Sequence, residues 1–358
     1  MLPIIPTSDS FAHRPDLTVD VAMTVCDGER YLEEQLQSIA GQTRAPTRLL
    51  VHDDASSDAS AEILGRFAAN APFPVWVFSA DVRIGSARSF ERVLAACSAD
   101  IVLLSDHDDR WSPNRLSRIV EQFATGDRPS LVYSDGRLID AVGQPTGATI
   151  WEVFAAPDVG TIDDPDLILR TLVAPFVPGC TIAISRALLA AALPFPRGLS
   201  LGAVGLEHDG WLVGLGWAQG AVVALPEPLI DYRIHEDQQV GLPARRTIRS
   251  HVVRPGGPGR HRRSELARRA AAATLLREGL DRYAPTSRSR RCADDLDALI
   301  AHLDARRQLP RSPVARTGVV RDMWRTGSYK RFSSGHRSVA VDLLALRPSR
   351  TGRRTYGR

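Results

Sequence analysis

Short apolar runs alternate with amphipathic segments along the first 135 residues of the chain. Between the runs, apolar residues recur every three or four positions, as at Leu32, Leu36 and Ile39, which predicts helices. The apolar runs that predict strands are residues 17–25, 47–52, 74–78, 101–104 and 131–134. Strands and helices in strict alternation with short connections predict an α/β protein built on an open, mostly parallel, doubly wound sheet.

The pattern changes after residue 135. It lapses over 136–178, where five prolines favour a loop with a helix near 164–172. We then expect a strand at 179–184, helices from Arg186 and over 206–217, and strands at 221–225 and 229–234. Amphipathic helices are expected at 265–283, 291–307 and 339–346, so the fold ends in a helical appendage.

These elements suggest a domain organisation. The Pro-, Gly- and Arg-rich stretch after residue 242 is typical of a linker. The predicted units are an extension (1–16), a sheet domain (17–242) with halves 17–135 and 136–242, a linker (243–263) and a basic helical region (264–358).

Charge separates the two ends of the 358-residue chain. Residues 1–242 hold 17 Lys and Arg against 32 Asp and Glu, whereas residues 243–358 hold 28 against 9. A basic region of this length favours an anionic partner, either nucleic acid or an anionic membrane surface. The alternative explanation for the many Arg residues in this region is a bias in the base composition of the genome.

Other totals restrict the protein class and its compartment. With 44% hydrophobic residues the chain can bury a large core. It has no apolar run long enough to span a membrane, and we expect no secretion signal because the start lacks basic residues. Four scattered cysteines indicate neither a zinc site nor a disulfide framework, so a cytoplasmic location is expected.

Carboxylates follow two of the predicted strands. Asp106, Asp108 and Asp109 come directly after the run 101–104, and Asp53 and Asp54 end the run 47–52. Crowded carboxylates at a strand end can hold a hard divalent cation, and that cation can hold a phosphate. The alternative is a solvated acidic turn, but a strand before the cluster and a Ser-Pro helix start after it favour a ligand site.

With these segments in place, the chain resembles the family 2 glycosyltransferases, which have the type A fold, and within them the rhamnosyltransferase-like group. The resemblance covers about residues 19–241. The segments that carry it, in order, are VAMTVCDGERYLEEQLQSI, VHDDASSD, residues 85–94, LLSDHDDRW, PGCTIAISRALL, LEHDGWL and YRIHEDQQVG. It implies that 17–135 binds the nucleotide sugar and 136–242 binds the acceptor.

The resemblance assigns the acidic cluster to a cation, Mg²⁺ or Mn²⁺, beside the donor's diphosphate. Asp108 is implied as the main metal ligand and Asp106 lies nearer the ribose. Asp109 is implied as a further ligand, with support of the next helix dipole as the alternative. His235 in YRIH is implied to complete the metal shell, although a lone His is more often simply packed or solvated.

The nucleotide is implied to contact the ends of the first two strands. Thr24, Asp53 and Asp54 are the residues at the matching positions, and the alternative is that the acidic pair belongs to a helix-capping turn. The chain departs from the family by having Cys26-Asp27 in place of a Tyr-Asn pair and Ser89 in place of an Asn. An aromatic neighbour for the base is therefore missing.

Asp209 is implied as the catalytic base, because it matches the Asp that starts the corresponding helix in the family. An inverting transfer needs a carboxylate that takes the proton of the attacking hydroxyl. A favourable contact with the helix dipole is the alternative. The residues implied as acceptor or sugar contacts are Trp111, Glu207, His208 and Trp211, with the core as the alternative place for Trp211.

Together these features predict an inverting, metal-dependent glycosyltransferase that moves a sugar from a nucleoside-diphosphate donor to a cell-surface polysaccharide or a polyprenyl-linked glycan. dTDP-rhamnose is the leading donor. The alternatives are a UDP-sugar transferase acting with GlcNAc, galactose or galactofuranose, and a non-catalytic relative that binds an anionic surface. A nucleic-acid-binding protein or a phosphotransferase with a nucleophilic Asp explains fewer of the motifs.

Overall fold

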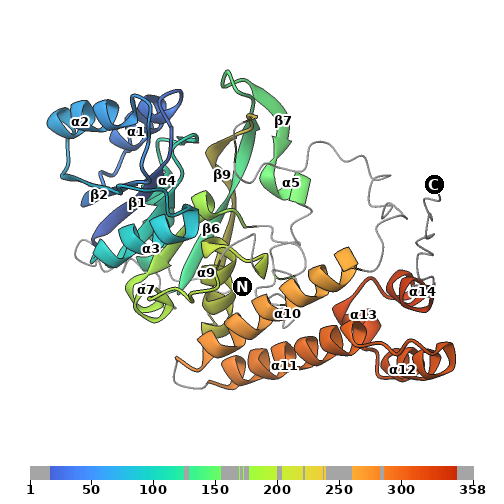
Figure 1. The fold of residues 1–358 in the computed structure, drawn as a ribbon. Helices are drawn as coiled ribbons and strands as arrows, with labels where there is room; N and C mark the ends of the chain where they lie inside the picture. The colour runs from blue at the N-terminus through green and yellow to red at the C-terminus, as the bar shows by residue number, and fades with distance from the viewer. Residues whose placement is uncertain are drawn as a thin grey trace, which may run out of the picture.

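The computed structural model describes residues 17–124, 129–154, 169, 172, 177–199, 204–220, 222–236, 238, 260–282 and 286–344. Their core is one mixed sheet in the spatial order β3-β2-β1-β4-β8-β6-β9-β5, with β7 paired to β6 outside that path (Figure 1). The strands are β1 (Val19–Val25), β2 (Arg48–Asp53), β3 (Val75–Ser79), β4 (Ile101–Ser105), β5 (Arg110–Trp111), β6 (Leu131–Ile139), β7 (Pro145–Thr149), β8 (Ile182–Ser185) and β9 (Val222–Arg233).

The first four strands form the parallel half of the sheet. β1 pairs with both β2 and β4, and β2 pairs with β3, all in parallel. In this register Val25 lies opposite Asp53 and Asp53 opposite Ser79, so the carboxyl ends of the strands share one edge. The connecting helices are α1 (Leu32–Ala40), α2 (Ser60–Asn70), α3 (Ser86–Ala96) and α4 (Arg115–Ala124). The predicted α/β class is confirmed here.

Strand direction in the other half corrects the prediction of a mostly parallel sheet. β8 is antiparallel to both β4 and β6, and β5 is antiparallel to β9, so four of the eight strand pairings are antiparallel. The expected strand at 179–184 begins as a 3₁₀ turn (Gly179–Thr181) and becomes β8 only at Ile182. The alternation of strands and helices in the sequence does not indicate the direction of each strand. The sequence pattern therefore did not predict the antiparallel pairings.

One long strand replaces the two strands expected at 221–225 and 229–234. β9 runs through Pro226 and Pro228, and its register against β6 shifts between Ser134 and Gly136. Proline cannot donate a ladder hydrogen bond, so an irregular point is where a strand tolerates it. β6 itself continues to Ile139 and is followed by β7 and α5 (Ile150–Phe154), although a loop was expected there. The helix expected near 164–172 lies outside the described residues, except for single positions.

Alternate side chains of the strands enter two cores on opposite faces of the sheet. Odd-numbered residues of β1, such as Val21 and Met23, pack in one core with α1, α2 and α4. Ala22, Leu50 and other even-numbered residues pack in the second core with α3, α7 (Arg186–Ala192) and α9 (His208–Gln219). This period-two division is why the strands are apolar on both faces.

The first two carboxy-terminal helices belong to the second core. α10 (Arg260–Leu280) and α11 (Ser287–Arg307) lie side by side below the sheet (Figure 1). Their Leu276 and Leu296 are fully buried in the core that contains α9. α9 is therefore covered on several sides, which explains why it is apolar around most of its circumference.

Three shorter helices follow: α12 (Pro313–Arg325), α13 (Ser328–Phe332) and α14 (His336–Leu344). The helical appendage is thus confirmed, but α12 and α13 were not predicted and α14 begins earlier than expected. The predicted extension 1–16 and residues 243–259 of the predicted linker lie outside the described residues, and α10 already begins at Arg260. None of the helices in the described ranges is both long and apolar enough to cross a membrane.

The packing of α10 against α9 can be tested by a substitution at their contact. A Cβ atom at Gly279 would lie 2.3 Å from the ring of the fully buried Trp211, whereas one at Gly318 of α12 would meet nothing within 4 Å. We expect Gly279→Ala to lower the free energy of unfolding by about 1–3 kcal/mol through overpacking. The control Gly318→Ala should raise it by up to about 1 kcal/mol, because alanine favours a helix. Equal effects in a urea titration would show that α10 is not packed on α9.

Candidate active site

The acidic turn after β4 forms the centre of the site. Asp106 follows directly on Ser105, which ends β4, and Asp109 precedes β5. Ligand atoms of Asp106, Asp109 and Cys180 all lie within 4.8 Å of one another. Cys180 comes from the 3₁₀ turn before β8, so two segments more than 70 residues apart in the sequence meet here.

The turn is electrostatically crowded. Burial, followed by the charges of Asp108 and Asp109, raises the pKa of Asp106 well above its usual value. Burial and the charge of Asp108 raise the pKa of Asp109 to about 7. No N–H or O–H group of the described residues reaches the second oxygen of Asp109. A cation would offset this repulsion, so the carboxylates fit Mg²⁺ or Mn²⁺ well.

Asp108 keeps its charge in this crowd. Burial would raise its pKa, but a hydrogen bond with His235 and the charge of His107 outweigh that effect and hold the pKa below its usual value. His235 Nε2 lies 2.9 Å from Asp108 Oδ2, although 127 residues separate them in the sequence. The structure thus brings together the two residues that the resemblance assigns to one metal shell. Their role as ligands remains a prediction.

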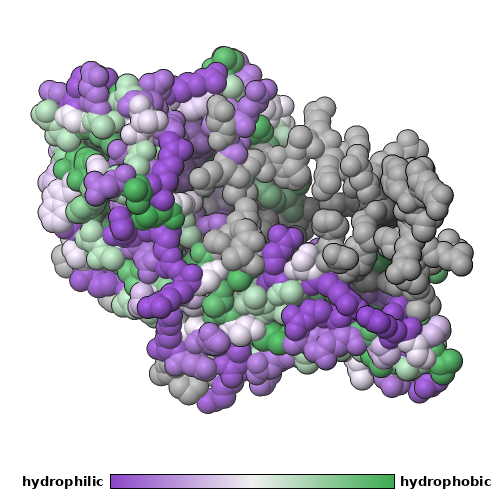
Figure 2. Space-filling view, in the orientation of Figure 1, coloured by the Kyte–Doolittle hydropathy of each residue, from purple (hydrophilic) through white to green (hydrophobic). Residues whose placement is uncertain are grey.

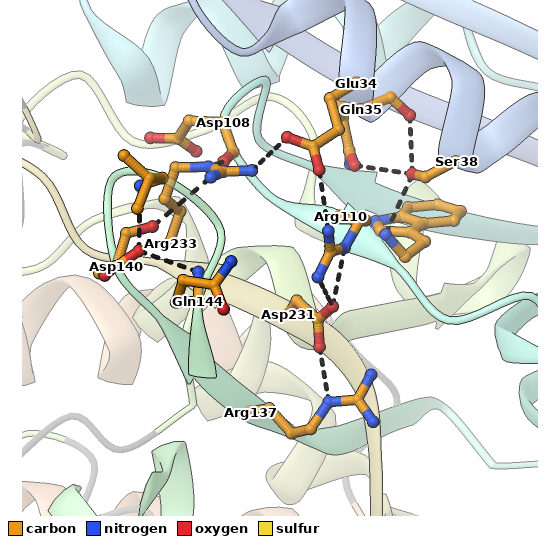
Figure 3. A network of polar contacts seen from close by, with 12 residues as sticks. Glu34, Gln35, Ser38, Asp108, Arg110, Arg137, Asp140, Gln144, Asp231 and Arg233 are labelled. Carbon is orange, nitrogen blue, oxygen red and sulfur yellow. Dashed lines mark hydrogen bonds and ion pairs between the residues drawn. The ribbon is translucent and has the colours of Figure 1, made fainter. Parts of the chain in front are cut away.

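Arg233, at the end of β9, fixes the turn from behind. Its backbone N–H donates to Asp109 Oδ1 (3.1 Å) and its Nε donates to the carbonyl of Asp108 (2.8 Å). Its side chain is 1% exposed and ion-pairs with Glu34 of α1 at 2.6 Å. In Figure 3 the carboxylate of Asp108 points away from Arg233, which holds only the backbone. One oxygen of Asp109 is thereby bonded to the backbone of β9, and the role of Asp109 as a further ligand remains a prediction.

A second arginine ties the same elements together. Arg110 contacts Glu34 at 2.9 Å and Asp231 at 2.7 Å, and Asp231 also accepts from Arg137 of β6 at 2.6 Å (Figure 3). α1, the acidic turn, β6 and β9 are therefore joined by one charged network. The motif YRIH contains Arg233, but the sequence predicts no role for this residue. No local pattern in the motif indicates that the guanidinium is buried.

Asp209 lies in the first turn of α9, next to the turn that carries Gly179 and Cys180. Its carboxylate accepts hydrogen bonds from the backbone N–H groups of Gly210 (2.6 Å) and Gly179. Gly179 is adjacent to Cys180, which touches Asp106 and Asp109, and the charge of Asp209 adds to the rise in the pKa of Asp106. The acidic turn and Asp209 therefore share one site. Burial raises the pKa of Asp209 to about 6.

The closeness of Gly179 to α9 explains why a glycine stands there. A Cβ atom at this position would lie 2.7 Å from His208 Nε2. His208 is buried and stacks on Phe90 with ring centroids 4.0 Å apart, and burial lowers its pKa to about 4. It is therefore a neutral, packed residue that supports the start of α9. Glu207 occupies the N-cap position of this helix without a capping hydrogen bond from its side chain, and the acceptor contacts of Glu207 and His208 remain predictions.

Two tryptophans expected to contact sugar are in the core, which corrects that prediction. Trp111 is 3% exposed and has the guanidinium of Arg115 4.4 Å from its ring centre. Trp211 is fully buried and its indole N–H donates to the carbonyl of Ala192 (3.1 Å). Both rings are therefore packed in the interior. Apolar spacing on α9 was the signal that favoured the core for Trp211.

Hydrogen bonds connect the loops that follow β1, β2 and β3, beside the acidic turn. Asp54 accepts from the backbone N–H groups of Ile84 and Gly85, both at 2.8 Å, so both of its oxygens already have structural partners. Asp53 accepts from the N–H of Ser56 at 3.1 Å and so belongs to the turn before α2, although it does not cap that helix. Thr24 lies nearby in β1 and is almost fully buried. The nucleotide contacts of these three residues remain predictions.

The departure at Cys26-Asp27 has a local structural role. Asp27 has a positive φ of 50°, a conformation that Asn and Asp tolerate better than most residues. Its carboxylate accepts from the N–H of Ser57 at 2.8 Å and ion-pairs with Arg83 of the loop before α3. Asp27 therefore locks three loops together. Ser89 is buried within α3.

Sequence comparison identifies the amino-terminal part of this arrangement. The model of Glycosyl transferase family 2 matches residues 20–139, which run from β1 to the end of β6 and include the acidic turn. Residues 20–139 are a glycosyl transferase family 2 domain. The predicted family is thereby confirmed, and the match leaves the remainder of the chain without a family assignment.

Curated relatives match over a similar stretch. An uncharacterized glycosyltransferase of Nostoc sp. is 31% identical over 112 residues, which is 31% of this chain and 34% of that protein. The O-antigen biosynthesis protein RfbC of Myxococcus xanthus is 30% identical over 115 residues, 32% of this chain and 9% of that protein. The matched region thus spans about a third or less of the length of these relatives.

A solved structure resembles nearly the whole chain. S. aureus TarS 1–349, crystallised with UDP-GlcNAc, superposes with a TM-score of 0.57 and 14% sequence identity, covering 92% of this chain and 89% of TarS. At that identity the likeness concerns the fold alone. It confirms the predicted type A glycosyltransferase architecture and extends it beyond the family 2 match into the carboxy-terminal helices.

Proposed function

We propose that the chain is an inverting, metal-dependent glycosyltransferase that moves a sugar from a nucleoside-diphosphate donor to a glycan hydroxyl. The observation that carries this proposal is the single site formed by Asp209 and the acidic turn, which are linked through Gly179 and Cys180. In this site the pKa of Asp209 is raised and that of Asp108 is lowered. This difference suits Asp209 to proton transfer and Asp108 to binding a cation.

In the proposed reaction, Asp209 acts as the general base. The acceptor oxygen attacks the anomeric carbon, the bond from that carbon to the phosphate oxygen breaks, and the acceptor proton passes to the Asp209 carboxylate. Asp108 and His235 would hold Mg²⁺ or Mn²⁺, which when bound neutralises charge on the departing diphosphate. Arg233 and Glu34 keep the Asp108 backbone in place.

dTDP-rhamnose is the proposed donor, and a cell-surface polysaccharide or a polyprenyl-linked glycan is the proposed acceptor. The resemblance to the rhamnosyltransferase-like group supports this choice, as does the partial match to an O-antigen biosynthesis protein. The alternative is a UDP-sugar, as in the TarS complex with UDP-GlcNAc. We place the reaction in the cytoplasm, where nucleotide sugars are made.

The donor is tested by thermal unfolding with nucleoside diphosphates in the presence and absence of Mn²⁺. We expect dTDP to raise the unfolding temperature more than UDP or GDP, and only with the cation, because the diphosphate is held through it. A shift selective for UDP would replace the rhamnose donor with a UDP-sugar. The absence of any cation-dependent shift would contradict the glycosyltransferase proposal itself.

The base is tested by Asp209→Asn, with Asp281→Asn at an exposed position of the helical region as the control. We expect Asp209→Asn to lower kcat for donor turnover by at least about 100-fold, because a positioned base contributes that much. Nucleotide binding should be unchanged. In the native enzyme kcat/KM should fall as the pH drops below about 6, since the base must be ionised. Activity that persists to pH 4 would exclude Asp209 as the base.

A further inference from the structure

The three last helices form a small unit with its own core. Leu309, Val320 and Tyr329 make a cluster separate from the two cores of the sheet. Asp342 of α14 is fully buried, and it accepts from the Tyr329 hydroxyl at 2.6 Å and from Arg306 of α11 at 2.8 Å. These bonds fix the rotation of α14, and the core fixes that of α12. The outward faces of both helices are therefore defined.

The outward faces of α12 and α14 carry large apolar side chains. On α12, Val314 lies on the side away from the buried Arg316 and Val320, and Trp324, four residues after Val320, lies at the edge of the core-facing side. On α14, Val341 and Leu344 are three residues apart. The exposed fractions are 84% for Val314, 39% for Trp324, 38% for Val341 and 77% for Leu344. Trp324 also contacts α14, because its ring centroid lies 4.5 Å from that of His336.

The same faces are strongly cationic. Arg321 and Arg325 are on the same side of α12 as Val314, and Arg337 is exposed on the side of α14 away from the buried Asp342. Over residues 309–344, all of them described, six Lys or Arg side chains are exposed against the single exposed carboxylate of Asp322. Figure 2 shows hydrophobic and hydrophilic residues interleaved at this end of the helical region.

Exposed apolar side chains within a cationic surface match the chemistry of an anionic lipid bilayer. Arginines meet the lipid phosphates, while Trp and aliphatic side chains enter the boundary between headgroups and acyl chains. A nucleic acid would also attract the arginines, but it offers no apolar layer for Val314 and Leu344. The combination of the two kinds of residue is what favours the membrane.

We propose that the faces of α12 and α14, which we call the α12–α14 surface, dock the protein on an anionic membrane. The surface is defined by Val314, Arg321, Trp324, Arg325, Arg337, Val341 and Leu344. It lies outside the active site, so membrane docking and transfer chemistry are separable. Docking would bring a transferase to an acceptor carried by a lipid.

The test is co-sedimentation of the full chain with vesicles of phosphatidylglycerol and phosphatidylcholine, compared with vesicles of phosphatidylcholine alone. We expect binding only to the anionic vesicles and weaker binding at high salt. The triple variant R321E, R325E, R337E should bind about a hundredfold more weakly or worse. Its matched control is R268E, R290E, R291E, which makes the same charge change at exposed positions of α10 and α11 and should bind like the native chain.

A second variant separates a membrane from other polyanions. V314S with L344S keeps every charge and alters two side chains that are mostly exposed, so the fold should be retained. We expect it to lose most vesicle binding and to keep its retention on a heparin column. Unchanged unfolding temperature and nucleotide binding would show that the loss belongs to the surface.

Three results would overturn the proposal. The native chain could fail to bind anionic vesicles, or the control arginines on α10 and α11 could matter as much as those on the α12–α14 surface. Tight binding to a DNA duplex, with vesicle binding unaffected by V314S and L344S, would assign the surface to nucleic acid. Each of these outcomes leaves the glycosyltransferase proposal untouched, because the active-site residues are intact in all the variants.

Discussion

Repulsion among the carboxylates after β4 is the constraint on which the site depends. Asp106, Asp108 and Asp109 lie within four consecutive positions of one turn, and burial together with the charges of their neighbours raises the pKa values of Asp106 and Asp109. Such a turn would open toward water unless it were held from outside. Arg233 holds it through one backbone carbonyl and one carboxylate, and Glu34 fixes Arg233 in turn. The scaffold thus keeps the charges together and leaves the Asp108 carboxylate and His235 available.

The turn before β8 connects this cluster to the proposed base. Because β8 is antiparallel to β4, the chain enters β8 at the edge where β4 ends, and Cys180 comes to lie against the acidic turn. The preceding Gly179 then donates to Asp209 at the start of α9. The antiparallel strand β8 therefore brings Asp209, the proposed base, into one site with the carboxylates of the acidic turn. α10 and α11 cover α9, which links the position of Asp209 to the carboxy-terminal helices.

Sequence patterns predicted much of this arrangement, and the gaps have physical reasons. Apolar runs located β1 to β4, and the motif order led to the acidic turn, Asp209 and His235, which are indeed neighbours through Asp108 and Cys180. The direction of β8 could not be predicted, since an apolar run reads the same in both directions. Arg233, a buried charge within an apolar strand, has no local signal because its partners Glu34 and Asp108 are distant in sequence. The predicted sugar contacts of Trp111 and Trp211 are wrong because aromatic residues close to a site also serve to pack the core.

The most direct test of the central claim is calorimetric titration of nucleoside diphosphate into the protein with Mn²⁺ and, separately, with a chelator. The native chain and the variant Asp108→Asn are compared, with Asp281→Asn at an exposed position of the helical region as the control. The account predicts that the native chain and the control bind the nucleotide more tightly with Mn²⁺ and that Asp108→Asn loses this gain. An equal gain in all three proteins would contradict the claim that the acidic turn holds the donor diphosphate through a cation.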